Sequence, residues 1–169
     1  MSKAVTVREA TPADDVRIGE ILVEAFVTAY ALKMPEVVVH DERKRELRAV
    51  AEKRKVATIL VAELDGKIVG TVSIFKPGAP GSESWLADGA DLRHLATDVS
   101  LHGKGLAAAL LLRTEEIVRD EWKLKHICLH VRRGAVGVAR MYVSRGYVRD
   151  PAGDMEKPGV YLEAHVLHL

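Results

Sequence analysis

The stretch Asp91–Leu112, DLRHLATDVSLHGKGLAAALLL, decides the fold of this chain. Its first part carries spaced apolar residues and predicts a strand that ends near Asp98. Its last part is rich in alanine and leucine and predicts a helix over Leu106–Val118. Between them lie Gly103 and Gly105. Glycines that lead into a helix leave its first N–H groups open, and the helix dipole favours an anion there. The stretch therefore predicts a site for a phosphate or pyrophosphate group.

Three known kinds of anion-binding turn have a sequence pattern of this type. A P-loop is excluded, because its second glycine must be followed by Lys, whereas Leu106 follows Gly105. A dinucleotide fingerprint fits Gly103 and Gly105, with Ala108 at the third glycine position, which tolerates alanine in some cases. That turn normally follows the first strand of a βαβ unit, whereas this one lies past the middle of the chain. A helix that begins on glycines and holds no ligand is a further alternative.

The third turn is the pyrophosphate loop of the GCN5-related N-acetyltransferases (GNAT), [RQ]-x-x-G-x-[GA]. The segment His102–Ala107, HGKGLA, resembles it, with His102 in place of Arg or Gln. The preceding Leu95–Asp98, LATD, resembles the Leu-Ala-Val-Asp that is usual before the loop in this family.

A second motif supports the resemblance. The segment Val138–Tyr147, VARMYVSRGY, resembles the family signature A-x-x-L-Y-x-x-x-G-[FY], with Tyr142 on the signature tyrosine. Two positions depart from the pattern: Val138 replaces a small residue, and Ala135 replaces an Asn that often contacts the cofactor. The resemblance extends from Val5 to the C-terminal strand, and the chain is identified as a member of the GNAT superfamily.

Membership implies an α/β (α+β) fold. We expect one mixed, mostly antiparallel central sheet with splayed fourth and fifth strands, flanked by helices, and a single domain over residues 1–169. The length and the 48% apolar content suit one compact domain. Patterning predicts strands over Val5–Arg8, Thr58–Leu64, Lys67–Phe75, His126–Val131 and Val160–Leu167, a helix that starts at Thr11, a helix over His40–Lys55, a hairpin turn at Asp65–Gly66 and a loop over Lys76–Glu83.

The resemblance implies acetyl-CoA as co-substrate and no metal. In the family the pantetheine arm pairs with the backbone of the fourth strand, here Leu95, Ala96 and Thr97. The pyrophosphate would rest on the turn and the helix start, at His102, Gly103, Lys104, Gly105, Leu106, Ala107 and Ala108. Glycine matters there because a Cβ would hinder the approach of backbone to phosphate oxygens.

The reaction implied is direct acetyl transfer from the thioester to a primary amine. Tyr142 is the candidate acid for the leaving thiolate, because a phenol stays protonated at neutral pH; a purely packing role is the alternative. The base is open between Asp91, His94 and a water, with His130 as a further option. Asp91 and His94 are separated by an odd number of positions and face opposite sides of a regular strand, so only one points into the site unless a bulge intervenes.

The resemblance implies an amine as the acetyl acceptor, but the sequence does not identify it. It is a small amine, a peptide N-terminus or a lysine. In this fold the acceptor groove is built from the region of Ala29–His40 and from Asp150–Gly159. The formal net charge of +1 argues against nucleic acid and gives no support for a membrane anchor. We expect a cytoplasmic protein. Homodimers are common in the family, and no segment here demonstrates one. The alternative function is a catalytically silent acyl-CoA-binding regulatory domain. His102 and Ala135 favour this alternative slightly, whereas Tyr142 and the glycine turn favour the enzyme, which is the function we expect.

Overall fold

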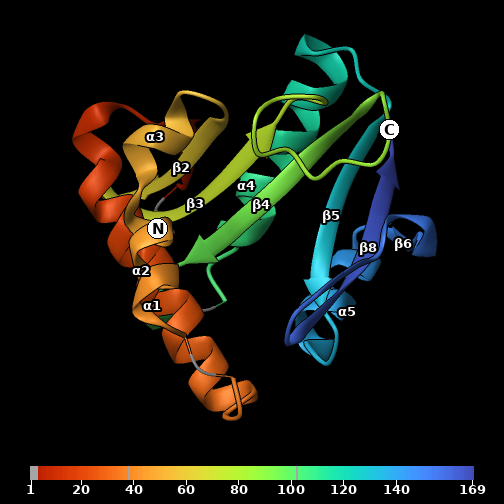
Figure 1. Ribbon diagram of the computed structural model, residues 1–169. Coiled ribbons are helices and arrows are strands. Elements are labelled where there is room, and N and C mark those ends of the chain that lie inside the picture. The colour runs from red at the N-terminus through yellow and green to blue at the C-terminus, as the bar shows by residue number, and fades with distance from the viewer. Residues whose placement is uncertain (1–3, 38, 102) are drawn as a thin grey trace. The chain divides into compact units, whose positions relative to one another are not determined.

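The structure is a computed structural model that describes residues 4–37, 39–101 and 103–169. Its strands form one sheet in the order β1-β2-β3-β4-β5-β8-β6, with β7 paired to β8 (Figure 1). The pair β4–β5 is parallel, and the other pairings that the structure describes are antiparallel. This mixed sheet, flanked by helices, confirms the expected fold class. The strands are β1 (Thr6–Glu9), β2 (Thr58–Leu64), β3 (Lys67–Phe75), β4 (Gly89–Thr97), β5 (His126–Arg132), β6 (Val148–Arg149), β7 (Met155–Lys157) and β8 (Val160–His168).

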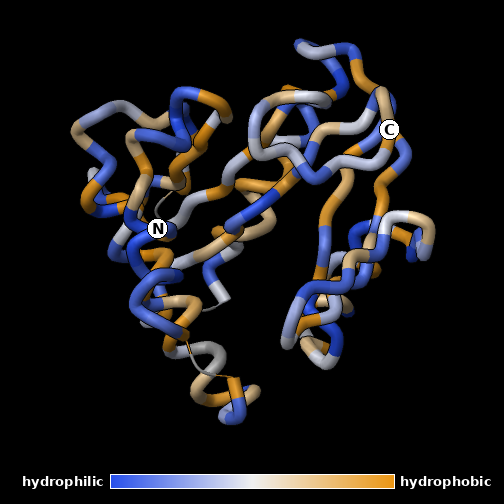
Figure 2. Tube along the Cα trace, viewed as in Figure 1, coloured by the Kyte–Doolittle hydropathy of each residue, from blue (hydrophilic) through white to orange (hydrophobic). Residues whose placement is uncertain are grey.

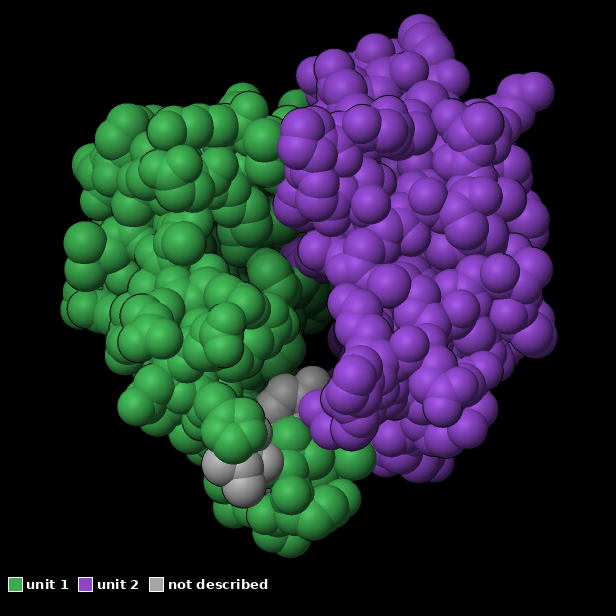
Figure 3. All heavy atoms as spheres, viewed as in Figure 1, with its two compact units in different colours: residues 1–74, 94–114 green, residues 75–93, 115–169 purple. Residues whose placement is uncertain are grey.

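Two compact units divide the chain (Figure 3). Unit 1 comprises Met1–Ile74 and His94–Thr114, and unit 2 comprises Phe75–Arg93 and Glu115–Leu169. The strand β4 therefore begins in unit 2 and ends in unit 1. The helices are α1 (Asp15–Lys33), α2 (Asp41–Arg48), α3 (Val50–Arg54), α4 (Leu106–Glu116) and α5 (Val136–Ser144). No helix in the described ranges is long and apolar enough to cross a membrane.

The β2–β3 hairpin of unit 1 follows the sequence prediction residue for residue. Its strands are largely apolar (Figure 2). Asp65 and Gly66 have φ values of 55° and 74°, the positive pair that a two-residue hairpin turn requires, and Leu64 pairs with Lys67 across it. The hairpin thereby places alternate side chains of β2 on opposite faces of the sheet as far as Ala62, where the register with β3 shifts.

Helices of unit 1 cover both faces of this hairpin. On one face lies a core from α1, α2, α3, β2 and β4, made of Ile18, Ile21, Leu22, Leu47, Val50, Ile59, Val61 and Ala96. On the other face α4 comes so close to β3 that a Cβ on Gly70 would lie 3.1 Å from a methyl of Leu110. The glycine therefore permits this packing distance.

The helix predicted over His40–Lys55 is two helices, which is a correction. The chain breaks at Ala49, with φ −77° and ψ 52°, between α2 and α3. At this point α2 packs against α1 so closely that a Cβ on Gly19 would lie 3.3 Å from the Cα of Arg48. Packing of Leu47 and Val50 into the core overrides the helix propensity of the segment.

The start of α1 matches its prediction. A 3-10 turn over Pro12–Asp14 follows Thr11 and leads into the helix. The Asp14 carboxylate accepts a hydrogen bond from the backbone N–H of Thr11 at 2.8 Å and pairs with Arg8 of β1 at 2.7 Å. The ion pair lowers the pKa of Asp14 to about 2. It joins the first strand to the first helix.

In unit 2, β5 pairs with β8 along its whole length, from His126↔His168 to Arg132↔Leu162. The short strands β6 and β7 were not predicted, because two or three mostly polar residues carry no periodic signal. These segments are strands because they pair with β8. The helix predicted to Val118 ends as α-helix at Glu116 and continues as a π-helical turn over Ile117–Glu121.

Candidate functional site

The glycine turn before α4 is open. Gly103 and Gly105 are exposed and have φ values of 79° and 72°, a backbone region that favours glycine. A Cβ built on either residue meets no described atom within 4 Å. The backbone surface of this turn is therefore open to a ligand.

The first turn of α4 supplies backbone donors to this surface. The N–H of Ala109 bonds to the carbonyl of Gly105 at 3.0 Å, which leaves the N–H groups of Leu106, Ala107 and Ala108 ahead of the hydrogen-bonded turns. Leu106 is buried and anchors the helix start, and Lys104 is exposed beside it. The predicted contact from His102 lies outside the described residues.

Asp98 fixes the chain between β4 and this turn. Its N–H donates to the carbonyl of Val69 on β3 at 2.8 Å. One carboxylate oxygen accepts from the N–H and hydroxyl of Ser100 at 2.9 and 2.7 Å, and the other accepts from Arg17 of α1 at 3.0 Å. The hydroxyl of Ser100 is the main cause of the lowered pKa of Asp98. Sequence reasoning quoted this aspartate only as part of LATD and missed its partner Arg17.

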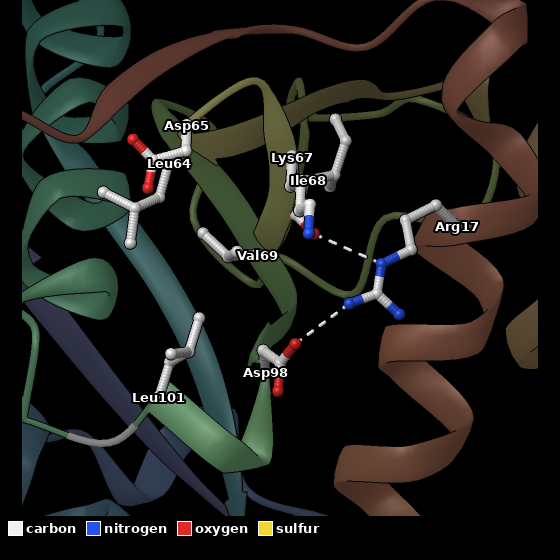
Figure 4. Close-up of a pocket in the computed structure, with 8 residues that line it drawn as sticks. All are labelled: Arg17, Leu64, Asp65, Lys67, Ile68, Val69, Asp98 and Leu101. Atoms are coloured by element: carbon white, nitrogen blue, oxygen red, sulfur yellow. Dashed lines mark hydrogen bonds and ion pairs between the residues drawn. The ribbon is translucent and has the colours of Figure 1, made fainter.

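A pocket of about 600 Å³ opens beside Asp98 within unit 1 (Figure 4). Its lining comes from α1, the β2–β3 hairpin and the segment after β4. Arg17 spans it, donating to the carbonyl of Ile68 at 3.2 Å and to Asp98. The lining residues are Arg17, Leu64, Asp65, Lys67, Ile68, Val69, Asp98 and Leu101.

The C-terminal half of β4 offers backbone groups along one edge. The N–H of Asp98 points to β3. In an antiparallel ladder the backbone N–H and C=O groups of successive residues point alternately to the two sides of the strand. The backbone groups of Ala96 therefore also point to β3, and those of Leu95 and Thr97 point to the opposite edge. The Ala96 side chain is buried in the core. The parallel pairs with β5 that the structure describes run only from Gly89↔His126 to Asp91↔Cys128.

His94 interrupts the regular strand. Its φ is +54°, so the alternation that relates it to Asp91 does not hold across this residue. The imidazole lies in unit 1 beside two cations: Nδ1 is 2.9 Å from the Nζ of Lys53, and Nε2 is 3.4 Å from a guanidinium nitrogen of Arg43. No signal in the sequence pointed to these two partners.

Asp91 lies in unit 2 and is completely buried. One carboxylate oxygen accepts from the N–H of Glu83 at 2.7 Å and lies 3.1 Å from the Nε of Arg93. Burial raises the pKa of Asp91 to about 8, whereas the guanidinium favours the charged form, so the two effects oppose each other. The geometry ties β4 to the loop that precedes it.

Tyr142 lies on α5 in unit 2 and is also buried. Gly146, with φ +99°, ends the helix and turns the chain so that the Tyr147 ring packs edge-on at 5.3 Å from the Tyr142 ring. Burial raises the pKa of Tyr142 well above its usual range, so the hydroxyl stays protonated and can donate. This explains the spacing of tyrosine, glycine and tyrosine in the signature.

His130, the weakest candidate base, is engaged in packing. Its Nε2 lies 2.7 Å from the carbonyl oxygen of Gly153, and its ring lies 5.1 Å from the Trp85 ring. Burial lowers the pKa of His130. In the described part of the chain, no group of three or more His, Cys, Asp and Glu side chains is placed to hold a metal ion.

The model of the acetyltransferase (GNAT) family matches residues 17–147. The chain belongs to this family. It is thus a GNAT acetyltransferase by family, and both predicted motifs lie inside the matched range. A search of curated protein sequences finds no match.

Solved GNAT structures share the fold. An acetyltransferase from Staphylococcus aureus Mu50 has a TM-score of 0.73 at 13% identity, over 98% of this chain and 99% of that chain. PaiA N-acetyltransferase from Thermoplasma acidophilum, solved in complex with coenzyme A, has a TM-score of 0.72 at 17% identity and the same coverage. YncA from Salmonella typhimurium, solved with its cofactor acetyl-CoA, has a TM-score of 0.67 at 20% identity, over 98% and 94% of the two chains.

Proposed function

We propose that this GNAT enzyme binds acetyl-CoA and transfers its acetyl group to a primary amine. The observation that carries the proposal is the open turn at Gly103 and Gly105, directly before the first N–H groups of α4; for those of Ala107 and Ala108 the described residues show no backbone acceptor. Backbone donors at a helix N-terminus suit a pyrophosphate, and Lys104 adds a positive charge. The coenzyme A and acetyl-CoA held by PaiA and YncA support the same ligand here.

The pantetheine arm would pair with the free edge of β4. Leu95 and Thr97 direct their N–H and C=O groups to that edge, so they are the proposed partners. The sequence predicted that the backbone of Ala96 would pair with the pantetheine arm as well. In this proposal its backbone groups bond to β3 instead, and its buried side chain packs in the core. Backbone pairing does not depend on the side chain, so threonine at position 97 is compatible with it.

In the proposed reaction the amine nitrogen forms a bond to the acetyl carbon, and the bond from that carbon to sulfur breaks. The amine loses one proton, and the sulfur, which leaves as thiolate, gains one. A backbone N–H of β4 would polarise the carbonyl as a small oxyanion site. The Tyr142 hydroxyl is the proposed donor to the sulfur, and its buried environment also disfavours a free thiolate, which makes protonation more favourable.

The proton from the amine needs an acceptor that the substrate can reach. Asp91 is completely buried and bonded to the N–H of Glu83. This supports a positioning role for Asp91 and leaves a water or His94 as the first proton acceptor; His94 would have to release its contact with Lys53 to take the proton. His94 is half-buried and follows Arg93, at the point where β4 changes unit.

The test is isothermal titration of acetyl-CoA into the wild type, Gly105→Val and Gly78→Val. Gly78 is a matched control, because it is exposed, has φ +77° and has no described atom within 4 Å of its added Cβ. Both variants take a similar backbone strain of about 1–2 kcal/mol. We expect Gly105→Val alone to lose at least about 100-fold in affinity, which corresponds to about 2.7 kcal/mol. Equal affinity in all three proteins would contradict the proposed cofactor site.

A further inference from the structure

The pocket beside Asp98 has no part in the proposed reaction (Figure 4). It is lined by residues of unit 1, and its volume of about 600 Å³ falls in the usual range of small-molecule sites, about 300–1,000 Å³. Two of its charged side chains are partly accessible, Arg17 at 37% and Asp98 at 19% exposed. Its apolar lining consists of Leu64, Ile68, Val69 and Leu101. The Arg17 pocket, as we call this space, therefore combines an apolar surface with charged groups that a ligand can reach.

Arg17 and Asp98 present opposite charges side by side in this pocket. The Nη2 of Arg17 donates to one carboxylate oxygen of Asp98 at 3.0 Å. Its Nε donates to the carbonyl of Ile68 at 3.2 Å, and its Nη1 contacts Glu20 at 3.5 Å. These contacts use three of the five N–H donors of a guanidinium, so two remain without a partner among the described residues. The Asp98 oxygen that faces Arg17 receives one hydrogen bond from the described residues, whereas a carboxylate oxygen can accept two. The pair can therefore bind a further charged group at each end.

The charges around the pocket balance. Lys67, at the start of β3, is exposed, and Asp65, on the hairpin turn, is exposed as well. With Arg17 and Asp98, the lining has two cationic and two anionic side chains. Such a lining attracts neither a pure anion nor a pure cation strongly, and it is complementary to a ligand that carries one charge of each sign.

An α-amino acid matches the pair of Arg17 and Asp98. Its ammonium and its carboxylate are attached to the same carbon atom, so its carboxylate can accept from Arg17 while its ammonium donates to Asp98 in one pose. An apolar side chain would contact the apolar lining of the pocket. We infer that the Arg17 pocket binds a free amino acid with an apolar side chain.

This amino acid is an effector and not the acetyl acceptor. A pantetheine arm that pairs first with Thr97 and then with Leu95 carries its sulfur along β4 and away from Asp98, so the acetyl group would lie away from the pocket. In addition, an ammonium that is paired with Asp98 is favoured in its protonated form, which has no lone pair for attack. The inferred site is therefore separate from the proposed reaction.

The pair of Arg17 and Asp98 also links the pocket to the pyrophosphate turn. Asp98 accepts from the N–H and hydroxyl of Ser100, and the N–H of Leu101 donates to the carbonyl of Asp98 at 3.0 Å. Gly103 follows two residues later. An amino acid bound to Arg17 and Asp98 together would hold this segment in place, so it should increase the affinity for acetyl-CoA. This regulatory effect rests on the proposed function.

Amino acid binding is tested on the protein without acetyl-CoA, by a titration followed through the backbone NMR signals of Val69 and Leu101. Leucine is the probe. Leucinamide lacks the carboxylate, isocaproate lacks the ammonium, and glycine lacks the apolar side chain, so each analogue removes one of the three proposed contacts. The proteins are wild type, Arg17→Gln and Lys67→Met. Lys55→Met is the control, because Lys55 is an exposed lysine of unit 1 outside the pocket.

We expect leucine to bind the wild type with a Kd of about 1 mM or lower. Leucinamide and isocaproate should bind at least about 10-fold more weakly, since each loses a hydrogen bond between charged groups. Glycine should bind at least about 10-fold more weakly, since it buries no apolar side chain. Arg17→Gln should lower the affinity for leucine at least about 10-fold, Lys67→Met about two-fold, and Lys55→Met not at all.

Three results would overturn the site: no saturable binding of leucine to the wild type, equal binding of leucine and leucinamide, or full leucine affinity in Arg17→Gln. The analogue series on the wild type decides the question even if Arg17→Gln does not fold.

The regulatory effect is measured by calorimetric titration of acetyl-CoA with and without saturating leucine. We expect leucine to lower the Kd for acetyl-CoA about five-fold, within the usual range of coupling between two sites. An unchanged or higher Kd in the presence of leucine would overturn the regulatory effect. Absence of acetyl-CoA binding in the wild type would overturn the proposed function and the regulatory effect with it. The leucine titration, made without acetyl-CoA, distinguishes that case from failure of the amino acid site.

Discussion

Unit 1 and unit 2 differ in what they leave available to a ligand. In unit 1 the turn at Gly103–Gly105 is exposed, and Leu95 and Thr97 direct backbone groups away from β3. In unit 2 the candidate residues Asp91 and Tyr142 are buried. The comparison teaches that the residues proposed to bind the cofactor are accessible in unit 1, whereas the two candidate residues of unit 2 are enclosed by protein.

The strand β4 shows the same contrast within one element. Its first residues, Gly89–Asp91, pair with β5 and are buried, and its last residues, Leu95–Thr97, lie in unit 1 with an edge for pairing. The change occurs at His94, whose φ of +54° interrupts the strand. Variants at the glycine turn and at Arg17 in unit 1 should therefore alter acetyl-CoA affinity, whereas variants at Asp91 and Tyr142 in unit 2 should alter turnover or stability.

The largest effect is expected from Tyr142→Phe, which removes only the hydroxyl. We predict a loss in kcat of about 100-fold or more, the usual contribution of a general acid, with the Kd for acetyl-CoA within two-fold of wild type. Steady-state thiol release and calorimetry measure the two quantities. An unchanged kcat would remove Tyr142 from the reaction and leave unit 2 without a chemical role.

The next effect is on stability. Asp91→Ala leaves the N–H of Glu83 without its acceptor in a buried site and should lower the free energy of unfolding by about 2 kcal/mol, measured by urea denaturation. Asp91→Asn keeps an oxygen for this N–H and is the matched control. The folded fraction of Asp91→Ala should bind acetyl-CoA normally. A selective loss of affinity without loss of stability would place Asp91 with the binding residues instead.

The pH dependence of stability tests whether Asp91 is protonated in the folded protein. Burial raises its pKa in the folded state to about 8, above the unfolded value near 3.9, so the folded state holds the proton more tightly. Wild-type stability should therefore fall relative to Asp91→Asn as the pH rises from about 4 to 8, by about 1 kcal/mol or more. Urea denaturation at several pH values checks this. The opposite slope would mean that Arg93 keeps the carboxylate charged.

The smallest effect is expected from Arg17→Gln in unit 1. Arg17 holds Asp98, which in turn fixes the chain before the pyrophosphate turn. A looser turn should weaken acetyl-CoA binding about two- to five-fold, which corresponds to about 0.5–1 kcal/mol. Calorimetry measures it, with the kcat at saturating acetyl-CoA expected to stay the same. A change confined to kcat would contradict the positioning role.

Much of the fold follows from local signals in the sequence. The hairpin at Asp65–Gly66 was predicted with its strand bounds, because the turn residues and the apolar strands agree. The break at Ala49 was not predictable, since it comes from the packing of α2 on Gly19. The short strands β6 and β7 are set by β8 and carry too few residues for a pattern.

The candidate site was predictable where it depends on backbone and glycine. The turn before α4 was predicted from Gly103 and Gly105 together with the alanine- and leucine-rich helix that follows them. The partners Arg17, Arg43 and Lys53 were missed, because they come from helices far away in the sequence and belong to no motif. The positive φ at His94 was missed for another reason: no glycine marks it.

The most direct test of the account is amide hydrogen–deuterium exchange of the wild type with and without coenzyme A. The account predicts slower exchange at the backbone N–H groups of Leu95 and Thr97 and of residues 103–108 when coenzyme A is bound. The N–H of Asp98, already bonded to Val69, should change little. Coenzyme A binding that protects other segments and leaves these amides unchanged would contradict the claim that unit 1 holds the cofactor through its backbone.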